Sequence, residues 1–401
     1  MSHSAKDFLA YAVCYAIWPF SYLMPRSERI LAFGAMRGAF SDNPKYLFLW
    51  AAQHLPGRKV VWLSADAAAV REVRKIGFEA YRIPSLRGFW YALRAGYWFI
   101  NCYTSDILFC LAGRTRVVNL WHGVGCKQIE FGITKGVLAK RYVDRDFWEC
   151  FYHPACFRRP DWFLSTSDFF DAHFSRAFRI GRERCIRAGY PRNMFLTADV
   201  ASATDFVQRF THGGEAELVE RIKPFAKVFL YMPTWRESQR DSFTSGFDLP
   251  RLNECLREQN AVALMKPHPN TRVDASATFS NLIFVPSAID IYSILPFTDV
   301  LITDYSGILY DYLLMPGKDV ILYFYDYDEY VADRELCQPI RGNVAGREVT
   351  TFDALIDCIR TGNYAMDEAE RTRIVCKFWS DTDAATSAET IMKALNLVEK
   401  P

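Results

Sequence analysis

The sequence predicts an α/β protein with two doubly wound parallel sheets. The chain has 401 residues, enough for two to three domains of about 150 residues each. Short apolar runs alternate with amphipathic stretches, a pattern typical of parallel strands joined by helical crossovers. The alternation pauses at a polar segment and then restarts. We therefore expect two domains that face each other across a cleft.

Strands of the first half are predicted where short runs of β-branched or aromatic residues are bounded by polar residues, glycine or proline. These runs are 29–34, 60–64, 97–102, 117–121, 162–166 and 186–189. Between them, 67–75 and 86–94 have helical spacing. Buried strands separated by helices indicate a parallel sheet covered on both faces.

The domain boundaries follow from the pause in this alternation. The polar helical stretch 204–223 is interpreted as a connecting segment between an N-terminal domain, 26–203, and a C-terminal domain, 224–401. The last helix of the chain can pack back on the N-terminal domain. Strands of the second half are predicted at 228–232, 261–265, 282–285, 300–303 and 320–324.

Charge and composition exclude some classes of protein. Lys and Arg number 48 against 46 Asp and Glu, so the net charge is only +2. This balance disfavours a nucleic-acid partner held by a basic field, and the 50% hydrophobic content excludes global disorder. The eleven cysteines form no CxxC pair, which indicates reduced thiols in a cytoplasmic protein.

The N-terminal segment, 1–25, contains an uncharged stretch over 8–25 with four Tyr or Trp residues and Pro19. Its polar flanks do not match a cleaved secretory signal. Three placements remain open. The stretch is a buried helix, a helix in the lipid headgroup region where Tyr and Trp are favoured, or a short membrane span.

Candidate functional residues are sought directly after the predicted strands, because ligands of open α/β sheets bind beyond the carboxyl ends of the strands. The stretch WHGVGCK (121–127) begins at the last residue of the run 117–121. His122 is a natural proton acceptor near neutral pH. Gly123 permits a tight turn whose amides approach phosphate, and Lys127 adds a cation. The alternative is a buried histidine that serves only its own turn.

Two further clusters follow strands of the second half. Thr234 and Arg236 come after 228–232, where an arginine either grips phosphate oxygens as a fork or pairs with a nearby acid. Lys266 and His268 come after 261–265. Prolines on both sides of His268 fix its backbone, which suits a group that must hold a diphosphate oxygen or protonate a leaving group. The alternative is a rigid turn with an incidental histidine.

The fourth cluster follows 300–303 and contains Asp304, Ser306 and Gly307. We expect Ser306 to cap a helix over 308–315, because helix N-termini bind anions; an ordinary cap is the alternative. The sequence lacks the P-loop, the dinucleotide GxGxxG fingerprint and the GxSxG nucleophile elbow. Together the four clusters predict a phosphate-binding site.

In this order, the clusters resemble the CDP-glycerol glycerophosphotransferase family, which includes teichoic-acid-type and capsule polymerases and primases. The matching stretches are NLWHGVGCKQIEFG (119–132), GYPRNMF (189–195), YMPTWRE (231–237), KPHPN (266–270) and ITDYSGILYDYLLMPGKDVILYFYDYDEY (302–330). Arg341 falls where the family often carries an Arg-Gly pair. The resemblance implies two GT-B-like domains. It also implies transfer of glycerol phosphate, or another polyol phosphate, from a CDP-activated donor to a hydroxyl, with release of CMP.

The resemblance also implies roles for the site residues. His122 corresponds to the proposed base, whereas His268, Arg236, Ser306 and the Gly307 amide correspond to the pyrophosphate-binding region. Gly123, Lys127, Thr234, Lys266, Asp304 and Arg341 are expected to bind substrate. No cofactor is required, although Mg²⁺ can enter through the donor diphosphate. Two departures stand out: Val-Gly-Cys after WHG, where the family usually has Thr-Pro-Leu, and Gly307, where a second serine is common.

The expected partners are a CDP-polyol donor and a lipid-linked saccharide or growing polymer as acceptor, with no nucleic acid. A lipid-linked acceptor places the enzyme peripherally at the cytoplasmic face of the cell membrane and favours the interfacial placement of 8–25. One alternative is a GT-B glycosyltransferase of cell-surface polysaccharide synthesis that uses a nucleotide sugar. Another is a catalytically idle binding protein of an export complex.

Overall fold

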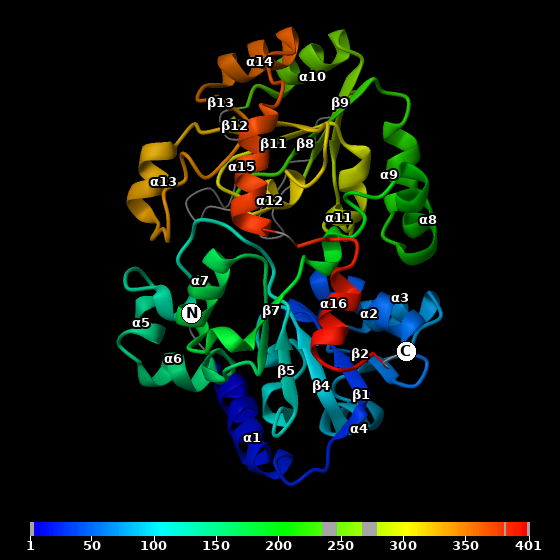
Figure 1. The fold of residues 1–401 in the computed structure, drawn as a ribbon, viewed down its shortest axis with the longest axis vertical. Helices are drawn as coiled ribbons and strands as arrows, with labels where there is room; N and C mark the ends of the chain where they lie inside the picture. Colours follow the sequence, from blue (N-terminus) through cyan, green and yellow to red (C-terminus); the bar gives the residue numbers. More distant parts are fainter. Residues whose placement is uncertain (1–3, 235–246, 267–278, 381, 399–401) are drawn as a thin grey trace. The chain divides into compact units, whose positions relative to one another are not determined.

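The computed structural model describes residues 4–234, 247–266, 279–380 and 382–398. By its internal contacts the chain forms two compact units (Figure 1). Unit 1 comprises 1–122, 128–194 and 381–401, and unit 2 comprises 123–127 and 195–380. The division differs from the predicted one, because 204–223 lies within unit 2 and the chain crosses between the units more than once.

Unit 1 is built on a seven-stranded parallel sheet with the order β3-β2-β1-β4-β5-β6-β7. The central strand β4 is buried along its whole length, as expected for a parallel sheet with helices on both faces. The strands are β1 (Ser27–Phe33), β2 (Lys59–Ser64), β3 (Ala80–Arg82), β4 (Ala95–Ile100), β5 (Arg116–Asn119), β6 (Trp162–Ser165) and β7 (Cys185–Arg187).

The helices of unit 1 include one from the far end of the chain, which contacts α2 and β7 (Figure 1). The α-helices are α1 (Ala5–Ser21), α2 (Asp42–His54), α3 (Ala67–Lys75), α4 (Leu86–Arg94), α5 (Ala139–Tyr142), α6 (Phe147–Tyr152), α7 (Asp168–Phe178) and α16 (Ser387–Ala394). A short 3₁₀ turn, η7 (Pro191–Asn193), follows β7.

Unit 2 is built on a six-stranded parallel sheet with the order β10-β9-β8-β11-β12-β13. The strands are β8 (Lys227–Tyr231), β9 (Ala261–Met265), β10 (Leu282–Phe284), β11 (Val300–Thr303), β12 (Asp319–Tyr323) and β13 (Arg347–Val349). The α-helices are α8 (Val200–Phe210), α9 (Glu215–Ile222), α10 (Leu249–Glu258), α11 (Ile291–Ile294), α12 (Ile308–Tyr312), α13 (Tyr327–Asp333), α14 (Phe352–Thr361) and α15 (Glu368–Trp379).

The N-terminal helix α1 begins after Ser4, whose side chain accepts from the Asp7 amide in a capping box. Pro19 lies in its last turn and the helix ends two residues later. In the part of the chain that the structure describes, no helix is both long and apolar enough to cross a bilayer.

Each sheet reverses its strand order once, between β1 and β4 in unit 1 and between β8 and β11 in unit 2. Such topological switch points are where open α/β sheets bind ligands, outside the carboxyl ends of the strands. The residues that follow β1, β4, β8 and β11 therefore lie where functional groups are expected.

Candidate active site

His122 lies just beyond the carboxyl end of β5, and its ring is fixed by a backbone carbonyl. The Nδ1 atom lies 2.9 Å from the carbonyl oxygen of Asn101, the residue that follows β4. A carbonyl only accepts, so Nδ1 carries the hydrogen and Nε2 keeps its lone pair. Burial lowers the pKa of the imidazole, which keeps the ring neutral near pH 7. The ring is therefore set up as a proton acceptor.

Three side chains that sequence reasoning missed surround this histidine: Asp42, Asn101 and Arg192. Arg192 Nη1 donates to the His122 carbonyl at 2.9 Å and to Asp42 Oδ1 at 2.7 Å. Asn101 Nδ2 donates to the other Asp42 oxygen at 2.7 Å. Asn101 follows β4 directly, so the rule on strand ends would have found it, whereas Asp42 lies nine positions after the end of β1. Arg192 lies in the GYPRNMF stretch.

The segment 123–127, which includes the predicted residues Gly123 and Lys127, belongs to unit 2 and packs against the start of α12. A Cβ added at Gly307 would lie 3.1 Å from the Val124 carbonyl oxygen. Cys126 Sγ lies 3.1 Å from the Tyr310 hydroxyl. The two departures from the family pattern are thus in contact: the Val-Gly-Cys segment approaches so closely that only glycine fits without displacement at 307.

Gly307→Ser tests this packing. Serine is normally a better N-cap than glycine by a few tenths of a kcal/mol, but here its Cβ must push the Val124 carbonyl aside. We expect this crowding to lower the free energy of unfolding by about 1 kcal/mol. The Tm in thermal unfolding should then fall by roughly 2–4 °C. A Tm equal to or above that of the wild type would contradict the close packing.

The prediction that Ser306 caps the following helix is wrong. Gly307 is the N-cap of α12 and makes no side-chain cap bond, and the helix spans five residues rather than 308–315. The chain leaves the helix in i→i+3 turn bonds from Leu314 and Met315, because Pro316 cannot continue it. Ser306 instead lines a narrow cavity in unit 2 together with Lys127 and Asp304.

Asp304 ties the carboxyl ends of β8 and β11 together at the switch point of unit 2. Its side chain is 1% exposed. The Oδ1 atom accepts from the Thr234 amide at 2.7 Å and from the Tyr305 amide at 2.6 Å. The predicted substrate residues Thr234 and Asp304 are therefore brought together, with the carboxylate fixing the backbone at both strand ends.

Lys266 is buried after β9, and its ammonium contacts main chain. Nζ donates to the carbonyl oxygens of Pro286 at 2.6 Å and Ile289 at 3.1 Å. Burial lowers its pKa to about 8, although Asp290 and Glu215 act in the opposite direction. In this geometry the lysine braces the loop before α11; the prediction that it binds substrate remains untested.

Lys266→Met separates these two roles through pH. A folded-state pKa below the unfolded value of 10.5 means that folding disfavours the charged amine. The stability of the wild type relative to the variant should therefore be lowest below pH 8 and rise by at most about 3 kcal/mol between pH 8 and 10.5. Urea unfolding across this range measures it. A pH-independent difference, together with a raised KM for the donor, would contradict the bracing role.

Arg341 is engaged in contacts with neighbouring side chains. Arg341 pairs with Glu348, its guanidinium lies 4.0 Å from the centre of the Tyr327 ring, and about half of its side chain is exposed. Arg236 and His268 lie outside the described residues. Their predicted roles stay predictions.

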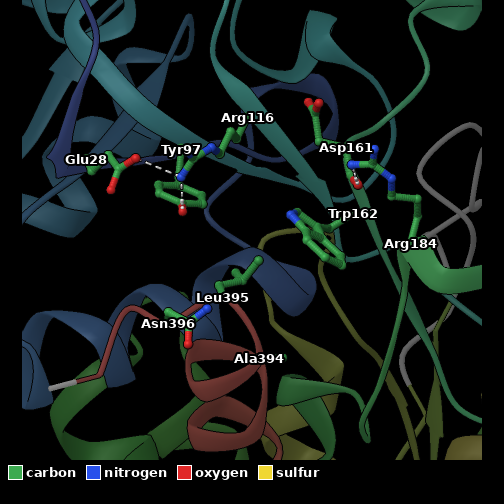
Figure 2. A pocket seen from close by; sticks show the side chains of 9 residues that line it. All are labelled: Glu28, Tyr97, Arg116, Asp161, Trp162, Arg184, Ala394, Leu395 and Asn396. Carbon is green, nitrogen blue, oxygen red and sulfur yellow. Dashed lines mark hydrogen bonds and ion pairs between the residues drawn. The ribbon is translucent and has the colours of Figure 1, made fainter. Parts of the chain in front are cut away.

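A separate cavity of about 480 Å³ lies in unit 1, at the amino ends of β1, β5 and β6 (Figure 2). Arg116 points between Glu28 and the Tyr97 hydroxyl and pairs with both. Arg184 donates to the Asp161 carbonyl and lies over the Trp162 ring. The arginines that line this cavity are thus engaged in contacts within the protein. The cavity opens at the amino ends of the strands, whereas His122 lies beyond the carboxyl end of β5.

A family model describes the chain almost completely. Residues 17–397 match the CDP-glycerol:poly(glycerophosphate) glycerophosphotransferase family. The chain belongs to this family and is a transferase enzyme. The resemblance found in the sequence motifs is confirmed.

Curated relatives carry names from teichoic acid synthesis. The teichoic acid glycerol-phosphate transferase of Staphylococcus aureus is 27% identical over 390 residues, covering 92% of this chain and 94% of the relative. The teichoic acid ribitol-phosphate polymerase TarK of the same organism is 28% identical over 359 residues, covering 86% of this chain and 64% of the relative.

Solved structures show the fold. The wall teichoic acid polymerase TagF has a TM-score of 0.75 at 18% identity, covering 99% of this chain and all of that one. The UDP-GlcNAc 2-epimerase of Neisseria meningitidis has a TM-score of 0.52 at 13% identity, covering 92% and 99%. The prediction of two parallel-sheet α/β domains of the GT-B-like kind is confirmed.

Proposed function

We propose that this enzyme transfers glycerol phosphate, or another polyol phosphate, from a CDP-activated donor to a hydroxyl of a lipid-linked saccharide or growing cell-surface polymer. The observation that carries the proposal is His122, held with Nε2 as proton acceptor at a strand end in a chain of this family. The names of its relatives support polyol phosphates as the transferred group. Release of CMP from CDP-glycerol in the presence of acceptor tests it.

The reaction is a displacement at the β-phosphorus of the donor. The acceptor oxygen forms a new P–O bond while its proton passes to His122 Nε2, a step that typically contributes about 10²–10⁴-fold. The bond from this phosphorus to the bridging oxygen breaks, and CMP leaves with the electron pair. Phosphoryl transfer depends mainly on positioning and on stabilisation of charge. We assign that stabilisation to Lys127, to the backbone that Asp304 fixes, and by family likeness to Arg236 and His268.

The charge of the donor diphosphate is met, in this proposal, by protein groups rather than by a cofactor. Lysine and arginine side chains and backbone amides stabilise phosphate oxygens in water-poor sites. Mg²⁺, where present, would enter bound to the diphosphate oxygens. Such an ion would add to the positive charge around the leaving CMP.

We include peripheral attachment to the membrane in the proposal, and an exposed apolar surface on unit 1 supports it. Helix α1 lies next to α6 (Figure 1). One face of α1 packs against α6, and the Tyr15 hydroxyl donates to the Phe151 carbonyl. The other face exposes Leu9, Val13, Ile17 and Phe20. Phe8, which stacks on Phe151, is also partly exposed, and α6 adds exposed Phe147 and Trp148. Apolar helix faces bordered by aromatic rings bind the headgroup region of lipid bilayers.

Val13→Glu tests this surface. Val13 is half exposed at the middle of the apolar face, so a charge there should reduce the partition coefficient onto liposomes by about tenfold, measured by flotation. The matched control is Val200→Glu on α8, where valine is 63% exposed, and it should float like the wild type. Equal flotation of wild type and Val13→Glu would show that α1 does not contribute to membrane binding.

A further inference from the structure

We infer that Asp42 is a positioning residue for His122, because its one carboxylate holds both attachments that orient the imidazole. The inference rests on the proposed function, since it takes His122 as the base. Asp42 is the first residue of α2 and follows the strand β1 at the switch point of unit 1. It touches neither the ring nitrogens nor, in this reading, the substrate.

The first attachment fixes the ring. His122 Nδ1–H is bonded to the carbonyl of Asn101, and the Asn101 side chain is held at both ends. Its Nδ2 donates to Asp42 Oδ2 at 2.7 Å, and its Oδ1 accepts from the Met36 amide at 2.9 Å. The Asp106 carboxylate accepts a hydrogen bond from the backbone amide of Asn101 at 3.2 Å. The acceptor of the imidazole proton is therefore part of a rigid turn that Asp42 helps to hold.

The second attachment fixes the backbone of His122. Arg192 Nη1 bridges the His122 carbonyl and Asp42 Oδ1. Its side chain is only 3% exposed, and a buried cation without its anion is strongly destabilising. Asp42 thus keeps Arg192 in the position from which it holds the histidine. Asp42 Oδ1 thus holds Arg192, which fixes the His122 backbone, and Oδ2 holds Asn101, which fixes the imidazole ring.

The backbone of Asp42 supports the same reading. Its φ is +62°, a left-handed conformation that is uncommon outside glycine and is tolerated best by Asn and Asp. Asp42 Oδ1 also accepts from the Asn43 amide at 2.7 Å, a local bond of the kind that allows this conformation. Strained conformations persist where the surroundings over-determine them, and they cluster at functional sites.

The charge of Asp42 also acts on His122. Burial lowers the pKa of the imidazole, Arg192 lowers it further, and Asp42 opposes both. Without the Asp42 charge, the histidine pKa must fall. Because the base works in its neutral form, the pH at which kcat/KM declines on the acid side should move to lower pH. Substitution of a residue with a purely structural role would lower activity without shifting this acid-side decline, the acid limb of the pH profile.

Asp42→Asn is the decisive variant, since asparagine keeps the size and tolerates the positive φ. Its amide group cannot accept from both Arg192 and Asn101, so the ring loses its fixed orientation. We expect kcat to fall about 10–100-fold, the acid limb to shift downward, and ¹⁵N NMR of the histidines to show mixed tautomers at His122. If Asp42→Asn does not fold, Asn101→Ala removes the side chain that ties this turn to Asp42 while it keeps the backbone carbonyl, and the loosened turn should give the same tautomer mixing.

The matched control is Asp171→Asn in unit 1. Asp171 pairs with Arg187, and its side chain is 18% exposed, as is that of Asp42. This variant should keep the wild-type acid limb and His122 tautomer. Adding Asp42→Asn to His122→Ala should cause no further loss. The inference is overturned if Asp42→Asn keeps wild-type kcat and tautomer, or if the double variant loses more. Wild-type turnover by His122→Ala would instead overturn the proposed base.

Discussion

Replacing His122 by alanine should reduce CMP release from CDP-glycerol in the presence of acceptor by at least about 10²-fold. The variant removes the proton acceptor but leaves the Asn101 turn, Arg192 and Asp42 in place. The chain should therefore fold, with an unchanged circular dichroism spectrum. Because the loss lies in the chemical step, kcat should fall and the KM for the donor should change little.

The chain offers a close control in His54. Its Nδ1 also lies 2.9 Å from a backbone carbonyl, that of Trp50, and its ring stacks on the Trp50 ring at 4.6 Å. The His122 ring likewise lies beside the ring of a tryptophan, with its centre 4.1 Å from that of Trp121, although the two planes are tilted by 35°. His54 is exposed at the end of α2, so His54→Ala should keep wild-type turnover. Equal losses in the two variants would show that a stacked histidine matters for folding rather than for proton transfer.

Asp304→Ala should have the second largest effect. It removes the acceptor of the Thr234 and Tyr305 amides, and buried amides without a partner cost on the order of 2–4 kcal/mol together. Release of the two strand ends should also misplace the Ser306 backbone. We expect the KM for CDP-glycerol to rise at least about tenfold, which corresponds to 1.4 kcal/mol.

Asp299→Ala separates lost stability from lost donor binding. Asp299 Oδ2 accepts from the Val228 amide at 2.8 Å, so it ties the same two strands, β8 and β11, at their amino ends. Both variants should lower the Tm in thermal unfolding. Only Asp304→Ala should raise the KM for the donor, and a similar rise in Asp299→Ala would mean that Asp304 serves stability alone.

The sheets could be predicted well because parallel strands buried on both faces leave continuous apolar runs. The strand over 261–265 is observed with the predicted bounds, and the helix over 86–94 likewise. The edge strands β3 and β13 were missed. Each has three residues with exposed positions, too few to show a pattern. The return of the last helix to the N-terminal unit was expected, but the assignment of 123–127 to unit 2 was not, since its contacts with distant residues leave no local signal.

The candidate site could be predicted only in part. His122, Thr234 and Asp304 follow strands directly, and the rule on strand ends locates them. Asp42 and Arg192 form an ion pair although 150 positions separate them in the sequence. The spacing of residues along the chain gives no indication of such a pair. The prediction that Ser306 caps the helix failed for a local reason. The chain passes from β11 directly into a turn, and Gly307 rather than Ser306 then occupies the N-cap position of α12.

The identity of the transferred group is the most direct test of the proposed function. Purified enzyme should be given CDP-glycerol, CDP-ribitol and nucleotide sugars in separate reactions with a lipid-linked saccharide acceptor. Released nucleotides and product masses should then be measured by mass spectrometry. We expect CMP release from a CDP-polyol and products heavier by whole polyol-phosphate units. Release of a nucleoside diphosphate from a nucleotide sugar, with no turnover of any CDP-polyol, would contradict it.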